Sequence, residues 1–91
     1  MYYVYIIESI IDGTLYKGFS LNYLQRLEDH NAGKSQYTST KIPWKLVFVQ
    51  EFETKREALQ REKSLKRSNS TYLRWLIDQP TNILRQDGSV G

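Results

Sequence analysis

The chain has 91 residues, of which 40% are hydrophobic and 25% are charged, as is typical of one small globular domain. It has no cysteine and a single histidine, His30, which excludes a disulfide scaffold, a thiolate metal site and a zinc site built from several imidazoles. Because thiolate and multi-histidine sites are excluded, a bound metal would be a hard cation held by carboxylate and water, such as Mg²⁺. The formal net charge of +3 favours a nucleic-acid partner only slightly.

The apolar run at the amino terminus is broken by Glu8 and has no basic segment before it. This pattern is typical of neither a signal peptide nor a membrane-spanning helix. We therefore expect a cytoplasmic protein with no membrane partner.

Residues 2–8 and 14–19 are predicted to form a β-hairpin, because both are rich in Val, Ile and Tyr and flank the turn-forming pair Asp12-Gly13. The first sixteen residues contain four tyrosines. Taken alone, a tyrosine in a strand is more often a packing residue than a catalytic one.

A helix is predicted from a cap at Ser20 or Asn22 to about Asn31. Arg26 and His30 are four residues apart and therefore share one face of this helix. From the spacing alone, a solvated helix edge and a functional pair are both open.

Residues 33–43 are small, polar and basic, and they are predicted to form a loop. Its hydroxyls, its amides, Lys34 and Lys41 suit phosphate contacts, but they suit an ordinary surface loop as well. Residues 44–52 are predicted to form a third strand, and the continuous apolar run at 46–49 predicts a central place in the sheet.

Thr54 and Glu57 form a capping box at the start of a helix predicted to run to about Arg67. Six of the thirteen basic residues lie in this helix: Lys55, Arg56, Arg61, Lys63, Lys66 and Arg67. This concentration of positive charge favours contact with a nucleic-acid backbone, with a solvated basic face as the alternative.

Glu62 lies four residues after Ala58 and three before Leu65, so it points toward the apolar side of this helix. An inward carboxylate is unfavourable unless it is paired or binds a cation. An internal salt bridge, a place at the edge of the apolar stripe and a metal site are all open.

Asn69 and Ser70 end this helix and begin a last short one, which Pro80 stops. Residues 79–91 are polar, and we expect a tail that is partly ordered at most. The predicted fold is α+β, with a three-stranded antiparallel or mixed sheet and about three helices in the order β-β-α-β-α-α.

Several short motifs follow one another along the chain: Val4-Tyr5-Ile6, Tyr16-Lys17-Gly18, Arg26 with His30-Asn31, Trp44, and Glu62 after Ala58-Leu59. As an ordered set, they resemble the motifs of GIY-YIG nuclease domains, specifically the small stand-alone bacterial members related to the nuclease module of the excinuclease. The resemblance predicts that residues 1–78 form one such domain. It implies a DNA endonuclease, with branched or damaged DNA as candidate substrates and DNA repair or recombination as its setting.

The resemblance also implies a role for each motif residue. Tyr16 would take a proton from the attacking water, Tyr5 would support the site by hydrogen bonding, and Arg26 would steady charge on the scissile phosphate. His30 would be a polar partner near that phosphate or the nucleophile, and Glu62 would anchor one divalent ion, Mg²⁺ or Mn²⁺. A free phenol has a pKa of about 10, so a tyrosine base also needs a nearby positive charge or a proton relay.

Basic side chains of the loop and of the second helix are predicted to contact the nucleic acid: Lys34, Lys41, Arg61, Lys63, Lys66 and Arg67. Two other interpretations are kept. The first is a nucleic-acid-binding module that retains the fold without catalysis, for which the basic residues suffice. The second is a protein-interaction domain that uses a patch of Trp44, Trp75 and the tyrosines.

Overall fold

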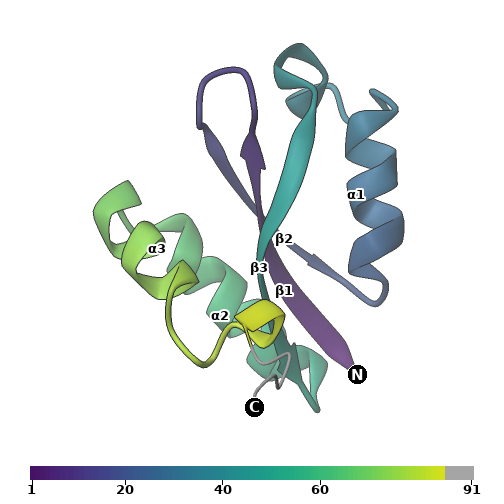
Figure 1. Ribbon diagram of the computed structural model, residues 1–91. Coiled ribbons are helices and arrows are strands. Elements are labelled where there is room, and N and C mark those ends of the chain that lie inside the picture. The colour runs from purple at the N-terminus through teal and green to yellow at the C-terminus, as the bar shows by residue number, and fades with distance from the viewer. Residues whose placement is uncertain (86–91) are drawn as a thin grey trace.

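Three antiparallel strands form one sheet in the computed structural model of the protein, which describes residues 1–85 (Figure 1). The strands are β1 (Tyr2–Ser9), β2 (Leu15–Ser20) and β3 (Trp44–Phe52), in the spatial order β2-β1-β3. The helices are α1 (Tyr23–Asn31), α2 (Lys55–Lys66) and α3 (Ser70–Ile77). The predicted α+β fold and the order β-β-α-β-α-α are confirmed.

The helices cover both faces of the sheet, with α1 on one face and α2 and α3 on the other (Figure 1). Alternation along β1 supplies both interfaces, because successive side chains of a strand point to opposite faces. Val4 and Ile6 pack with Phe48 in the core that contains residues of α2 and α3. Tyr5 and Ile7 pack in the core on the α1 side. The central strand β1 is therefore buried on both faces.

Strand β3 lies at an edge of the sheet, so the predicted central place for residues 46–49 is wrong. The apolar run has another cause. Phe48 is buried in the core on the α2 and α3 side, and Val49 is buried in the core on the α1 side. A strand that is covered on both faces is apolar along its length wherever it lies in the sheet.

The outer edge of β3 is bound by the side-chain amides of two asparagines. Asn31 accepts from the N–H of Trp44 at 2.6 Å and donates to the carbonyl of the same residue at 3.0 Å. Asn82 accepts from the N–H of Val49 at 3.1 Å and donates to the carbonyl of Val47 at 2.9 Å. Each amide occupies backbone groups that would otherwise be open to pairing with another strand.

The segment after α3 returns to the sheet through Asn82, which is fully buried. Asn82 also donates to the carbonyl of Ile77 at 2.9 Å, and a short 3-10 turn, η2 (Ile83–Arg85), follows. The boundary at residue 78 and the partial order of residues 79–91 stay predictions, and residues 86–91 lie outside the described residues. Between residues 1 and 85, no helix is long and apolar enough to span a membrane.

The helices begin at caps that the sequence predicts. Asn22, Thr54 and Asn69 each accept from the backbone N–H three residues further on, at 3.1, 3.2 and 2.8 Å. After α1 the chain turns at Gly33, whose φ of 79° is the left-handed conformation that glycine favours. These ends fix which side chains each helix directs toward the sheet.

Candidate active site

The side chain of Tyr5 lies over Gly18 of the neighbouring strand. The two residues are paired in the register of β1 and β2. A Cβ atom at position 18 would lie 2.4 Å from the Tyr5 ring, so only glycine leaves room for the ring. The glycine of the second motif therefore determines where the tyrosine of the first motif lies.

His30 joins Tyr5 to the loop between α1 and β3. Its Nε2 lies 3.0 Å from the Tyr5 hydroxyl, and its Nδ1 lies 2.8 Å from Oγ1 of Thr38 in the 3-10 turn η1 (Thr38–Lys41). The exposed fraction is 1% for Tyr5 and 0% for both His30 and Thr38. Both ring nitrogens of His30 thus have a buried hydroxyl within hydrogen-bond distance, and the imidazole connects Tyr5 to Thr38.

The protonation of this pair follows from its burial. Burial lowers the pKa of His30, and the positive charge of Arg26 acts in the same direction. Burial raises the pKa of Tyr5, against the opposite influence of the Arg26 guanidinium that faces its hydroxyl. At neutral pH the imidazole is therefore uncharged and the Tyr5 phenol keeps its proton.

Tyr16 lies beside His30 on the same face of the sheet. Its ring is 4.9 Å from the imidazole, in an edge-on arrangement, and it also contacts the rings of Tyr37 at 6.0 Å and Trp44 at 6.4 Å. Tyr16 is half-buried. Among residues 1–85, no group forms a hydrogen bond with its hydroxyl. The two motif tyrosines therefore differ, because Tyr5 is held in a network whereas Tyr16 is held through its ring.

Arg26 brings a positive charge to both phenols. Its interaction with the Tyr5 hydroxyl is the main cause that raises the pKa of Arg26, and the nearby Asp29 and Tyr16 act in the same direction. Nη1 of Arg26 lies 3.5 Å from Oδ2 of Asp29, and the arginine side chain is 39% exposed. Part of the guanidinium therefore stays open to an anionic ligand beside the two tyrosines.

Glu62 approaches the same tyrosine from helix α2. Its negative charge contributes to raising the pKa of Tyr5, which places the carboxylate within electrostatic range of the phenol. The Glu62 side chain is only 19% exposed and forms an ion pair with Lys66 at 3.4 Å. The predicted inward direction of Glu62 agrees with this low exposure. The structure thus gathers all five predicted catalytic residues in one region: Tyr5, Tyr16, Arg26, His30 and Glu62.

A single carboxylate fits the usual way in which Mg²⁺ is held beside phosphate groups. This ion keeps several waters and takes one or two carboxylates together with oxygens of the substrate phosphates. Glu62 offers such an oxygen, and its ion pair with the exposed Lys66 is of a kind that contributes little to stability. In the described part of the chain, no three His, Asp or Glu side chains form a group that could hold a metal by themselves. Glu62 would therefore hold an ion together with water and substrate.

The basic residues predicted in the loop are held by acidic neighbours. Lys34 forms an ion pair with Asp29 at 3.5 Å, and Lys41 forms one with Asp12 at 2.6 Å. Lys41 holds the pKa of the Asp12 carboxyl well below its usual range. These pairs restrain both lysines around η1, and their charges are partly balanced there.

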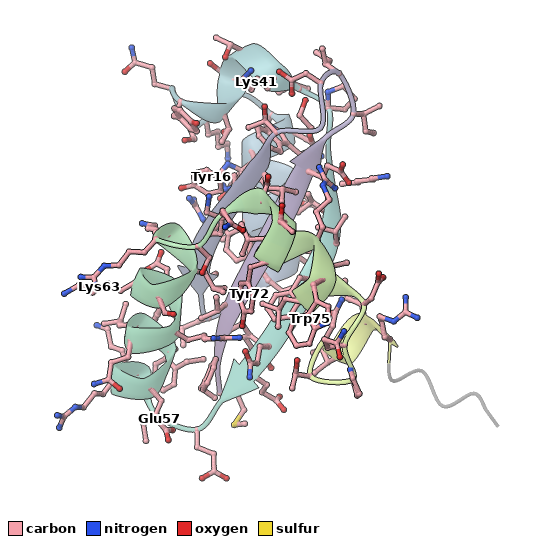
Figure 2. The ribbon with its side chains drawn as sticks, turned by 90° about the vertical axis from the view of Figure 1, so that its left-hand side faces the viewer. Tyr16, Lys41, Glu57, Lys63, Tyr72 and Trp75 are labelled. Carbon is pink, nitrogen blue, oxygen red and sulfur yellow. The ribbon has the colours of Figure 1, made fainter. Side chains whose placement is uncertain are left out.

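The four basic residues predicted in and after α2 are less uniform. Arg61 donates to the side chain of Gln50 at 3.2 Å, and Lys66 forms an ion pair with Glu62. Lys63 and Arg67 are exposed. The second helix therefore presents a partly free basic surface, with Lys63 extending away from the protein (Figure 2).

One residue of the network, Thr38, does not stand out in the sequence. It lies in a polar loop beside Ser39 and Thr40, and no periodicity separates it from them. Its carbonyl accepts from Nε1 of Trp44 at 2.9 Å.

The hypothesis of a protein-interaction domain needs Trp44 to be part of an exposed aromatic patch. Trp44 is buried, so the prediction of a patch that contains it is wrong.

The fold and this cluster define a class of protein, which comparison with known proteins identifies. Residues 1–74 match the family model of the GIY-YIG catalytic domain. The chain belongs to the GIY-YIG family, as its motifs predict. Membership of this nuclease family suggests endonuclease activity and implies a nucleic-acid substrate.

Bacterial relatives extend the match beyond the motifs. A UPF0213 protein of Bacillus licheniformis is 44% identical over an alignment of 72 residues that covers 75% of this chain and 73% of that protein. A UPF0213 protein of Staphylococcus haemolyticus is 42% identical over an alignment of 66 residues that covers 71% of this chain and 79% of that one. The solution NMR structure of a UPF0213 protein from Bacillus halodurans is 31% identical with a TM-score of 0.58, over 89% of this chain and 87% of that chain.

Proposed function

We propose that this protein is a metal-dependent endonuclease that hydrolyses phosphodiester bonds of DNA. The observation that carries the proposal is the gathering of two tyrosines, an arginine and a carboxylate around a buried neutral histidine. A merely structural hydrogen bond between Tyr5 and His30 needs neither the exposed part of Arg26 nor the inward Glu62. Phosphodiester hydrolysis needs a positioned water, positive charge near the phosphate and a route for protons.

Each side chain has a role that its surroundings support. Tyr16 takes a proton from the attacking water, because its hydroxyl is not held by the described protein groups and lies in the field of Arg26. Arg26 contacts the scissile phosphate through the open part of its guanidinium. Tyr5 orients Arg26 and the water by hydrogen bonding, and His30 holds Tyr5.

The reaction is balanced by one water molecule. The water oxygen gives one proton to Tyr16 as it bonds to phosphorus, and Tyr16 passes its own hydroxyl proton on to solvent. The ester bond between phosphorus and one sugar oxygen then breaks, and the departing oxygen takes up one proton from solvent. Mg²⁺ or Mn²⁺ bound at Glu62 would supply positive charge for the oxygens on which negative charge develops. The protein itself supplies the geometry and the proton acceptor.

The nucleic acid would lie along a basic path. In Figure 2, Tyr16 lies between Lys41 at one end of the molecule and Lys63 of α2 toward the other. Arg67 is exposed as well. We propose that a DNA backbone follows this direction past the tyrosines, and that branched or damaged DNA met during repair or recombination is the substrate.

A binding module without catalysis is the second candidate, favoured by the exposed Lys63 and Arg67. It requires salt-sensitive binding that weakens when α2 is neutralised. It gives no reason for the inward Glu62 or for an arginine beside two phenols.

The test is cleavage of a panel of labelled single-stranded, duplex, flap and junction DNAs, and of RNA counterparts, in Mg²⁺, in Mn²⁺ and in a chelator. We expect nicking of at least one DNA that requires the ion and that Glu62→Gln abolishes. Lys66→Gln removes the same ion pair and keeps the carboxylate. Because Lys66 is itself a predicted DNA contact, the two variants are compared at saturating protein, where Lys66→Gln should keep ion-dependent nicking. Binding without cleavage of any substrate in either ion would refute the nuclease and support the binding module.

A further inference from the structure

The imidazole of His30 stands between two hydroxyl groups, and its neutral form can carry its proton on either nitrogen. In one arrangement, Nδ1–H donates to Thr38 and Nε2 accepts from Tyr5. In the other, Thr38 donates to Nδ1 and Nε2–H donates to Tyr5. The distances of 2.8 Å to Thr38 and 3.0 Å to Tyr5 permit both.

The other partners of the two hydroxyls distinguish these arrangements. Thr38 has an alternative acceptor, because its Oγ1 lies 3.4 Å from the carbonyl of Ser35. Tyr5 has none among residues 1–85, because the other polar group on its hydroxyl is the guanidinium of Arg26, which can only donate. If Nε2–H donated to Tyr5, the phenol proton would be left without a protein acceptor in a buried place. A buried donor without an acceptor is strongly unfavourable, so this arrangement is disfavoured.

Burial and backbone hydrogen bonds of the loop around Thr38 fix the position of this residue. Thr38 is fully buried, its carbonyl accepts from Nε1 of Trp44 at 2.9 Å, and the N–H of Ser39 donates to the carbonyl of Ser35 at 2.9 Å. Every buried side-chain nitrogen and oxygen in the described residues has a partner. The position of the hydroxyl is thus determined by the fold before any substrate binds.

We infer that Thr38 is a positioning residue, which accepts from Nδ1–H of His30 and so fixes the tautomer whose Nε2 accepts the Tyr5 proton. The lone pairs of Tyr5 are then directed away from His30, toward Arg26 and the open side of the site. Thr38 acts on the site through His30 and Tyr5 without touching substrate. The tautomer itself does not depend on any activity, whereas the effect on cleavage rests on the proposed function.

The test uses the fact that His30 is the only histidine of the chain. Long-range ¹H–¹⁵N spectra of the ¹⁵N-labelled protein report directly which ring nitrogen carries the proton. The wild-type protein should show protonated Nδ1 and unprotonated Nε2. Thr38→Val, which keeps the shape and removes the hydroxyl, should move the proton to Nε2, and Thr38→Ser should restore the wild-type pattern.

Cleavage of the DNA that the wild-type protein cuts best is measured on the same samples, after circular dichroism shows that each variant is folded. Thr38→Val should lower the rate roughly 10- to 100-fold, as loss of a supporting hydrogen bond commonly does, and Thr38→Ser should stay near the wild-type rate. If Thr38→Val does not fold, the spectra of the wild-type protein and of Thr38→Ser still test the inference, because both should show the proton of His30 on Nδ1.

The inference is overturned if wild-type His30 carries its proton on Nε2, or if Thr38→Val keeps it on Nδ1. A moved proton with an unchanged cleavage rate would refute the positioning role. The expected spectra together with a wild-type protein that cuts no nucleic acid would support the assigned tautomer and refute the proposed function.

Discussion

The Tyr5 hydroxyl lies 3.0 Å from Nε2 of His30 and joins the central strand to helix α1 inside the protein. Tyr5→Phe removes the hydroxyl and leaves a buried ring nitrogen without its partner. We expect the free energy of unfolding in urea to fall by about 1–3 kcal/mol. Tyr16→Phe is the matched control, since its hydroxyl forms no hydrogen bond with residues 1–85, and it should change that free energy by less than about 0.5 kcal/mol. Equal stability of the two variants would contradict the different roles of the two tyrosines.

Gly18 is predicted to control the site through the room it leaves for Tyr5. Gly18→Ala places a methyl group against the phenol ring, and we expect a loss of stability of about 1–3 kcal/mol. The variant should also shift the NMR signals of the His30 ring, because Tyr5 must move. Gly33→Ala is the control. It introduces backbone strain, but the added methyl group meets only the side chain of Ile42 at 3.8 Å, an ordinary van der Waals contact, so the His30 signals should stay in place. Unmoved His30 signals in Gly18→Ala would show that the glycine does not position Tyr5.

Stability should depend on pH through the single histidine. Burial and Arg26 lower the pKa of His30 in the folded protein below the value of about 6.5 in the unfolded chain. The unfolded chain therefore binds more protons as the pH falls below about 6.5, and the contribution of His30 to stability, present above that pH, is lost. We expect the free energy of unfolding to fall between pH 7 and pH 5.5, with a slope of at most about 1.4 kcal/mol per pH unit from this group.

Urea denaturation at several pH values measures this slope, and His30→Gln supplies its reference. That variant lacks the titrating group and should be nearly flat over the same range. A wild-type curve as flat as that of His30→Gln would mean that the imidazole is not held neutral by the fold.

The amide of Asn82 is predicted to stabilise the fold and to keep β3 from pairing with another chain. Asn82→Ala leaves a buried N–H of Val49 and a partly buried carbonyl of Val47 without partners, so stability should fall by at least about 2 kcal/mol. Sedimentation velocity should show more dimer or aggregate than for the wild-type protein. Asn31→Ala, which frees backbone groups of Trp44 alone, should have the smaller effect on stability. A monomeric Asn82→Ala of wild-type stability would contradict this account of the edge.

Local signals in the sequence predict the elements well, because caps and turns depend on a few neighbouring residues. The Asp12-Gly13 turn and the caps at Thr54 and Asn69 are examples. The order of the strands depends on long-range contacts. The prediction of a central place for residues 46–49 was wrong because an edge strand covered on both faces has the same apolar pattern as a central one.

For the candidate site too, the sequence predicts some residues and leaves others unpredicted. The ordered motifs identify Tyr5, Tyr16 and Glu62 through the resemblance to a family. The spacing of Arg26 and His30 predicts a shared helix face, but it does not tell that one side chain is buried and the other partly exposed. The partner of His30, Thr38, could not be predicted, because a loop residue acquires its contact only through the packing of the whole chain.

The central claim is that Tyr16 acts on the water that attacks DNA. Its most direct measurement is the single-turnover cleavage rate of Tyr16→Phe in Mg²⁺, with the DNA that the wild-type protein cuts best and after urea denaturation has confirmed wild-type stability. Loss of a proton-transfer group commonly costs about 10²–10⁴ in rate, so we expect the variant to be at least about 100-fold slower at unchanged DNA affinity. A rate within about twofold of the wild-type rate would contradict the assignment, because the variant differs only by the hydroxyl.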